Sequence, residues 1–221
     1  MNYGVQDYTF KSDFEARLYG AAEGRFFKPD RFSEKSYSQS PYSFSENNPI
    51  NNIDVNGDSV IVSGSKAYVN QVAGDLKQLQ NMGDKVVRKK VIDLITSPET
   101  HKIVAPTKPR NRNRVNSAED EANHKSTGTT TEYDPNATEN NAGEKRKPIV
   151  GLAHELSHAH DADKGTTNFN TTSKKGGDKL YEVDAVNFEN RVRAKTGDKQ
   201  RTSYSYPIPK KYLKTFKQES E

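Results

Sequence analysis

The chain contains no cysteine and no tryptophan, and it is poor in hydrophobic residues of every kind. The lack of cysteine excludes disulfide bonds and thiolate metal sites, so histidine and carboxylate side chains are the strong ligands left for a transition metal. It also suits a reducing compartment. Hydrophobic residues make up 31% of the 221 residues and the mean hydropathy is −1.03. A buried core therefore requires that the apolar residues gather in one part of the chain.

Long apolar runs are absent as well. No segment approaches the roughly 18 apolar residues of a membrane span, and the first residues, MNYGVQDYTFKSDF, lack the basic and apolar regions of a cleaved signal peptide. We therefore expect neither. The net charge is +4, but the 34 basic residues are interspersed with 30 acidic ones, so we expect no nucleic acid partner.

Residues 1–50 differ in composition from the rest of the chain. They hold eleven of the twenty aromatic residues, almost no Val, Ile or Leu, and a run rich in Ser, Asn and Pro. A short helix is predicted around Ser12–Ala22, where Ser12 and Glu15 would form a capping box. We otherwise interpret the segment as a flexible leader, with a secretion or partner-binding segment as the alternative. The folded domain is predicted to occupy residues 51–221.

The pattern of this domain predicts an α+β fold. Asn56-Gly57 is typical of a hairpin turn because both residues tolerate positive φ. Apolar residues at helical spacing predict helices, two of them ended by Gly83 and Gly197, and β-branched residues predict strands. The predicted elements are a hairpin around 53–62, a helix at 66–82, a helix or strand at 85–96, strands at 101–106 and 128–133, and helices starting at 148 and near 180.

Two segments between these elements carry further expectations. The strand GTTTEYDP, residues 128–135, is predicted to lie at an edge of the sheet because a proline closes it. Residues 108–127 show no periodicity and predict a long loop. Its arginines, Arg110, Arg112 and Arg114, suit a solvated loop, with a docking patch as the alternative.

The segment IVGLAHELSHAHDAD, residues 149–163, contains three of the five histidines of the chain. His154 and His158 lie about 40° apart around a helix and about 6 Å apart along it, so both imidazoles can bind one ion. Glu155 can accept a proton from a metal-bound water and pass it to a leaving amine. Zinc is the metal expected for imidazole and carboxylate ligands. The alternative is a chance pair of histidines on a surface helix, but the apolar residues before His154 favour a buried motif.

A catalytic zinc needs a third protein ligand. His160 points away from the pair and no histidine follows it, so this ligand should be a carboxylate. Glu182 is preferred, because a loop and an antiparallel helix can return it to the histidines. Asp161 and Glu189 remain the alternatives, each of which also suits a residue that orients a histidine.

Arg201 and Tyr204 follow the second of these helices. Three residues apart, they can aim a guanidinium and a phenol at the oxyanion of a tetrahedral intermediate. A surface arginine beside an anchoring tyrosine is an equally good interpretation from the residues alone.

The order of these motifs resembles the NleD-like family of bacterial effector zinc metallopeptidases over about residues 100–207. The shared pattern is a strand ending in Tyr-Asp-Pro, an apolar helix with H-E-L-x-H-A, a helix with Glu-Asn-x-x-Arg, and a late Arg-x-x-Tyr. The resemblance implies that His154 and His158 bind zinc and that Glu155 is the general base. It implies a zincin-like fold, in which a small mixed sheet with an edge strand packs against the H-E-x-x-H helix and a second helix carries a glutamate.

The same resemblance bears on the remaining site residues. It points to the helix of Glu182 for the third ligand, although family members often carry two adjacent glutamates where this chain has Tyr181-Glu182. It favours an oxyanion role for Arg201 and Tyr204, because a comparable pair serves the oxyanion in clostridial neurotoxin proteases, whose zincin fold is similar.

Members of this family enter host cells by type III secretion or occur as toxin modules, and the best-studied relatives cut mitogen-activated protein kinases of the JNK and p38 type. The resemblance implies a secreted effector that cleaves a host protein in the host cytoplasm, with a secretion chaperone as a further candidate partner of residues 1–50. An extended substrate is expected to pair with the edge strand near Thr129–Tyr133. The alternatives are a toxin protease that acts on bacterial proteins and a non-catalytic module with a structural zinc. Glu155 favours catalysis, because a structural site does not need an acid beside the metal.

Overall fold

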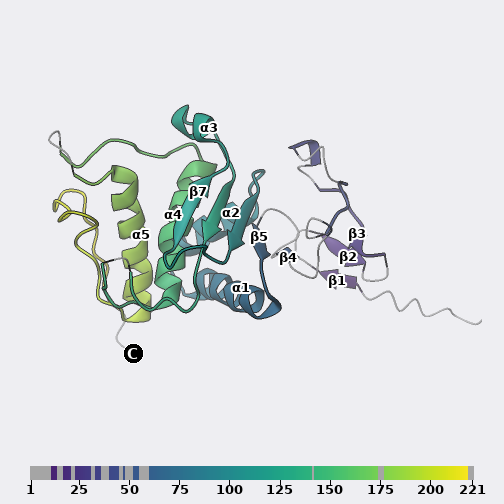
Figure 1. Cartoon of the computed structure of the whole chain (residues 1–221), viewed down its shortest axis with the longest axis horizontal. Helices are drawn as coiled ribbons and strands as arrows, with labels where there is room; N and C mark the ends of the chain where they lie inside the picture. The colour runs from purple at the N-terminus through teal and green to yellow at the C-terminus, as the bar shows by residue number, and fades with distance from the viewer. Residues whose placement is uncertain are drawn as a thin grey trace, which may run out of the picture.

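The computed structural model of the chain contains a larger α+β domain and a small sheet near the N-terminus (Figure 1). The mixed α+β class is as predicted. The structure describes residues 11–13, 17–20, 23–30, 33–35, 40–44, 47, 52–54, 60–140, 142–173 and 177–218.

The larger domain is built on a mixed sheet of five strands in the order β4-β5-β6-β8-β7. The central strands β5, β6 and β8 are parallel, and the two outer strands run antiparallel to their neighbours. The strands are β4 (Asn52–Asp54), β5 (Val60–Ser63), β6 (His101–Val104), β7 (Arg112–Val115) and β8 (Thr129–Glu132).

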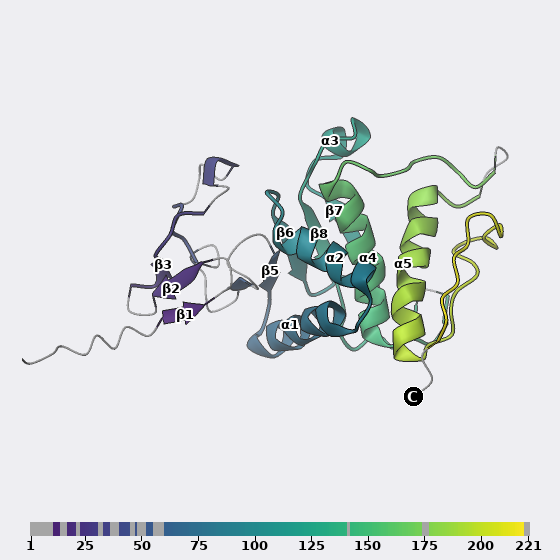
Figure 2. The ribbon, with the colours of Figure 1, turned by 180° about the vertical axis from the view of Figure 1, so that it is seen from behind.

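Helices α1, α2 and α4 lie on one side of this sheet, and α5 packs against α4 (Figures 1 and 2). Val62 and Ile103, opposite each other on neighbouring strands, are buried in the core that these helices cover. No helix in the described part of the chain is long and apolar enough to cross a membrane. The helices are α1 (Lys66–Asn81), α2 (Lys85–Ile95), α3 (Ala118–Ala122), α4 (Pro148–Asp163) and α5 (Leu180–Thr196).

The predicted hairpin and helix ends are confirmed. β4 and β5 pair antiparallel with Ile53 opposite Val62, while Asn56-Gly57 itself lies outside the described residues. Gly83 and Gly197 follow the last residues of α1 and α5 with φ of 82° and 76°. This left-handed backbone is open to glycine at little cost, and it stops the helix.

The segment 85–96, which the sequence leaves as helix or strand, forms helix α2. Its buried Val87, Val91 and Leu94 recur at helical spacing. Lys89 faces solvent, whereas Lys90 is partly buried and reaches α4. Asp84 accepts hydrogen bonds from the first backbone N–H groups of the helix and caps it.

The long loop predicted over residues 108–127 is wrong, because this segment contains strand β7 and helix α3. β7 lacks an apolar pattern because its side chains have polar partners on both faces of the sheet. Asn113 donates to Thr131 Oγ1 at 2.8 Å, and Arg112 Nη2 donates to Glu132 Oε1 at 2.9 Å. The pairing with β8 therefore stabilises a strand that hydrophobicity does not reveal.

The edge position predicted for residues 128–133 is also wrong. β8 lies between β6 and β7 and pairs with both, so its backbone cannot receive an additional strand. The outer strand on this side is β7, which packs against α4. Main-chain pairing of a substrate with Thr129–Tyr133 is excluded by this topology.

The helix predicted around Ser12–Ala22 is wrong as well. The described residues of that segment form β1 (Lys11–Asp13) and β2 (Leu18–Gly20), which join β3 (Arg25–Phe26) in a three-stranded antiparallel sheet. The ring of Tyr19 contacts the rings of Phe26 and Phe44, with centroids 5.9 Å and 4.2 Å away. These aromatic contacts join distant residues and outweigh a local capping preference. A 3₁₀ helix follows at Ser33–Lys35.

Asp163 ties the end of α4 to the sheet. Its buried side chain accepts hydrogen bonds from Ser97 and from His101 Nε2, the latter at 3.3 Å, and Lys164 Nζ lies 2.7 Å from its other oxygen. The second nitrogen of His101 lies 2.9 Å from Thr129 Oγ1. Burial raises the pKa of Asp163, but the hydrogen bonds from His101, Lys164 and Ser97 outweigh it and lower the pKa to about 2.

Asp163→Ala is expected to lower the free energy of unfolding at pH 7 by roughly 3 kcal/mol, because Ser97 and His101 lose a buried charged acceptor. The folded-state pKa lies below the unfolded value of about 3.9, so this stabilisation is complete above that value and is lost as the pH falls towards 2. Urea denaturation of wild type and variant would show the difference at pH 7 and its narrowing in acid. A difference that does not change with pH would contradict the assignment, and Glu119→Ala, which removes an exposed acid, is the control.

Candidate active site

The H-E-L-S-H segment lies in the middle of α4, whose apolar residues anchor the helix in the core. Leu152 and Leu156 are buried there. His154 and Glu155 are each 8% exposed, and His158 is partly buried. All three polar side chains line a pocket of about 910 Å³, to which α4, α5 and β7 contribute.

Glu182, in the first turn of α5, faces the two histidines. The Nε2 atoms of His154 and His158 are 3.3 Å apart, and Glu182 Oε2 lies 3.4 Å and 3.1 Å from them. Among the described residues, these three make up the group whose ligand atoms, all within 4.8 Å of one another, can hold a metal ion. Ligand atoms about 2.0–2.1 Å from a tetrahedral zinc lie about 3.3–3.4 Å apart, so the separations suit such an ion.

The hydrogen bonding of these side chains also suits a metal. His154 Nδ1 lies 3.1 Å from Glu189 Oε2, so Nδ1 carries a proton that it donates and Nε2 can offer its lone pair to an ion. Glu182 Oε2, the oxygen that faces both Nε2 atoms, is buried. Burial lowers the pKa of His154, but hydrogen bonds to Glu182 and Glu189 outweigh it and raise the pKa to about 9. A metal therefore competes with a proton at this position.

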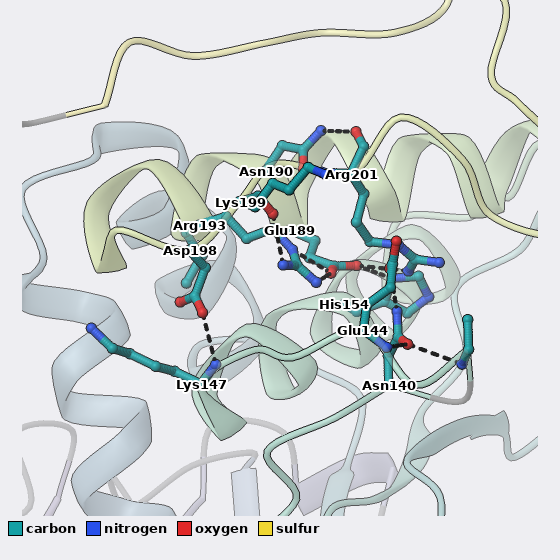
Figure 3. A network of polar contacts seen from close by, with 12 residues as sticks. Asn140, Glu144, Lys147, His154, Glu189, Asn190, Arg193, Asp198, Lys199 and Arg201 are labelled. Atoms are coloured by element: carbon teal, nitrogen blue, oxygen red, sulfur yellow. Dashed lines mark hydrogen bonds and ion pairs between the residues drawn. The ribbon is translucent and has the colours of Figure 1, made fainter.

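Glu189 is buried behind the ring of His154 and not among the three ligand atoms (Figure 3). Arg193 Nε donates to Glu189 Oε1 at 2.7 Å, and Arg201 Nη1 donates to Oε2 at 3.2 Å. Burial raises the pKa of Glu189, but His154, Arg201 and Arg193 outweigh it and lower the pKa to about 2. The carboxylate is thus ionised and fixes the orientation of His154.

Arg201 and Tyr204 both reach the site. The backbone of Arg201 is held by Asn190, and its guanidinium also approaches Glu144, with Nε 3.2 Å from Oε2 (Figure 3). The ring of Tyr204 stacks on that of His154 at a centroid distance of 5.7 Å and an interplanar angle of 6°. Burial and the charge and hydrogen bond of Glu182 raise the pKa of Tyr204. Its phenol therefore stays protonated beside the ligand group.

Asp161 and His160 are directed to α2 instead. Asp161 Oδ1 lies 3.4 Å from Lys90 Nζ, and His160 Nε2 lies 3.1 Å from Asp93 Oδ2. Asp161 lines the pocket but lies outside the group of three ligand atoms. Its contacts fix the packing of α4 on α2.

Glu155 lies in the pocket next to His154 on α4. Burial raises the pKa of Glu155, and the negative charge of Glu182 raises it further. The positive charges of His154, His158 and Arg146 lower it. In the described part of the chain, its carboxylate forms no ion pair within 4.0 Å. A carboxylate with a raised pKa and free oxygens is suited to accept and return a proton.

Sequence reasoning missed two charged residues of the site, Glu144 and Arg146, and assigned no role to Arg193, the arginine of the Glu-Asn-x-x-Arg pattern. Arg193 follows Glu189 by four residues, and this spacing on a helix is a signal that predicts an ion pair. Glu144 and Arg146 lie in a polar stretch without periodicity, where their residue types do not distinguish them from neighbouring charges.

Glu189→Gln is expected to lower the free energy of unfolding by roughly 3 kcal/mol, because Arg193 and Arg201 would keep buried charges without a carboxylate partner. Denaturation in the presence of a chelator would measure this effect apart from any bound metal. Asp184→Asn, which changes an exposed acid on the same helix, is the matched control. Equal stability of Glu189→Gln and wild type would contradict the role of Glu189.

Comparison with known proteins agrees with the geometry of the site. The model of a family of effector proteins, Peptidase M91, matches residues 56–204. This range contains α4, α5 and the segment that carries Arg201 and Tyr204. Comparisons with curated proteins and with solved structures gave no match. Because the matched range spans more than half of the chain, the chain belongs to the Peptidase M91 family of effector proteins, the peptidase family that the NleD-like resemblance indicates.

Proposed function

We propose that this effector peptidase is a zinc-dependent endopeptidase of the zincin type that cleaves a host protein. The observation that carries the proposal is the convergence of His154 Nε2, His158 Nε2 and Glu182 Oε2, at separations of 3.1–3.4 Å, in a pocket that also contains Glu155. Two imidazoles and one carboxylate are a frequent protein ligand set of catalytic zinc, and they leave a position for water or substrate.

In this proposal His154, His158 and Glu182 hold the zinc, which when bound acts as a Lewis acid and lowers the pKa of water. Glu155 takes up a proton from the attacking water and returns it to the leaving amine. Glu189 keeps the Nδ1–H tautomer of His154, so that Nε2 stays available for the metal.

The contacts in the site support an oxyanion role for Tyr204 more strongly than for Arg201. Tyr204 keeps its phenolic proton and lies against the ring of His154, so its hydroxyl is suited to donate to the oxyanion. The guanidinium of Arg201 contacts Glu189 and Glu144 in this structure. Its main contribution is to hold Glu189, and through it His154.

The substrate is proposed to bind as an extended segment along β7. This strand lies at one edge of the sheet, and its residues line the pocket together with His154 and Glu155. Pairing of a peptide with an exposed strand supplies main-chain hydrogen bonds and leaves alternate side chains to specific contacts. Because β7 and not β8 lies at the edge of the sheet, β7 is the strand expected to bind the substrate.

The family supports secretion and action in a host, because its members are effector proteins. Delivery by a type III system into the host cytoplasm is part of the proposal and comes from the NleD-like resemblance. The same resemblance makes mitogen-activated protein kinases of the JNK and p38 type the first substrates to test.

The proposed ligand set predicts one zinc ion per chain. His158→Ala and Glu182→Ala are expected to raise the zinc dissociation constant by more than about 100-fold, beyond the roughly 10–100-fold typical of a lost outer partner. Asp161→Ala, which changes a pocket acid outside the ligand group, should bind zinc like wild type. Elemental analysis and competition with a chelator measure these affinities. Because the metal displaces a proton from His154, the affinity should fall as the pH decreases below about 9.

Glu155→Gln is expected to bind zinc with wild-type affinity and to lower kcat by more than about 100-fold, the low end of what general acid–base catalysis contributes. The test compares new protein termini, identified by mass spectrometry, in host-cell lysate treated with wild type or with Glu155→Gln. Purified kinases of the JNK and p38 type are included as single substrates. Full activity of Glu155→Gln would overturn the mechanism, whereas termini in other host proteins alone would change the substrate and leave the mechanism intact.

A further inference from the structure

Arg146 brings a guanidinium into the pocket from the stretch that precedes α4. Its backbone N–H donates to Thr138 O at 2.8 Å, which fixes the position of the residue. Its side chain is partly buried and lines the pocket together with His154 and Glu155. The proposed mechanism assigns no role to this side chain.

Gly151 creates the space in which this guanidinium lies. A Cβ added to Gly151 would overlap with Nη1, Nη2 and Cζ of Arg146, so the guanidinium rests directly on the backbone of α4. Residues four apart share one face of a helix, which places Glu155 one turn further along that face. The charge of Arg146 is thus seated about one helical turn from the proposed general base.

Arg146 has no carboxylate partner of its own. Across the described ranges, its guanidinium forms no ion pair within 4.0 Å, and its Nε atom is buried without a hydrogen-bond partner. Arg193 and Arg201, the neighbouring guanidiniums, both bind Glu189. A partly buried cation without a partner is costly, and an anionic ligand relieves that cost.

Strand β7 and the residues before it add positive charge to the same pocket. Arg110, Arg112 and Arg114 line it, and both Arg110 and Arg114 are exposed. Glu132 pairs with Arg112 at 2.9 Å and with Arg114 at 3.5 Å. A substrate segment along β7 would therefore lie on a strand rich in arginine, in the pocket that Arg146 also lines.

We propose that Arg146, seated on Gly151, binds an anionic side chain of the substrate next to the scissile bond. The inference rests on the proposed endopeptidase function and specifies its substrate class. A carboxylate and a phosphate share the chemistry that a guanidinium recognises, because both offer oxygen pairs to its parallel N–H groups.

The first test is a peptide library made by Lys-specific digestion of a host-cell lysate, cut again by the zinc-loaded full chain. The new termini define the residues that flank the cut. Wild type is expected to enrich acidic or phosphorylated residues at one position next to the cut, and Arg146→Gln to lose that enrichment. Matched peptides with Asp, Asn or phosphoserine at this position then measure the preference for an anionic residue. The kcat/KM for an anionic peptide is expected to be about tenfold above that for the Asn peptide. The Asp and phosphoserine peptides distinguish the two anions.

Gly151→Ala tests the geometry without removing the arginine. Alanine suits a helix better than glycine, and the group it displaces is the end of a flexible side chain, so the fold should persist by thermal unfolding. The variant is expected to lose the preference for the anionic peptide as Arg146→Gln does, and the double variant should show no further loss. Arg146→Lys should retain part of the preference, because it keeps the charge but not the planar group.

The control is Arg88→Gln, which removes an exposed positive charge on α2 away from the pocket and should leave the preference unchanged. Equal cleavage of the Asp, Asn and phosphoserine peptides by wild type would overturn the inference while leaving the endopeptidase intact. An unchanged preference in Arg146→Gln or in Gly151→Ala would overturn it as well. A wild-type chain that binds zinc and cuts no peptide or protein would instead overturn the proposed function, and the inference with it.

Discussion

The site depends on one buried carboxylate, that of Glu189. It accepts hydrogen bonds from His154 on α4, from Arg193 on its own helix, and from Arg201 in the segment after α5. A buried ion is tolerated only when its partners are in place, and removing one partner leaves an uncompensated charge. Three parts of the chain must therefore assemble together before burial of the Glu189 carboxylate becomes favourable. The orientation of the proposed ligand His154 and the packing of α4 on α5 thus come from the same interaction (Figure 3).

Features that depend on local periodicity could be predicted from the sequence. His154 and His158 converge because four residues are nearly one helical turn, whatever surrounds the helix. Glu182 joins them because α5 starts after a connection long enough to bring its first turn back to α4. Gly197 ends that helix through its backbone freedom alone. These inferences need only spacing, residue type and the length of the connection between α4 and α5.

The inferences that failed depend on pairing between distant segments. β7 becomes a strand because β8 offers Thr131 and Glu132 as partners to its polar side chains. That same pairing removes β8 from the edge of the sheet. Near the N-terminus, Tyr19 packs on Phe44, twenty-five residues away along the chain, so the contact overrides a capping preference read within four residues. Propensity reports what a segment does alone, and tertiary contacts reverse it where they are stronger.

Gly151 shows that a residue unfavourable for its own helix can indicate a functional contact. A glycine inside a helix costs about 1 kcal/mol relative to alanine, and in IVGLAHEL it interrupts an otherwise apolar helix start. The core gains nothing from it, since alanine would fill the same turn. The structure supplies the reason, because only a residue without Cβ leaves room for the Arg146 guanidinium on the face that carries Glu155. Such a departure from local preference is expected where a chain places a functional group, and here it places a free cation beside the acid proposed to act as the general base.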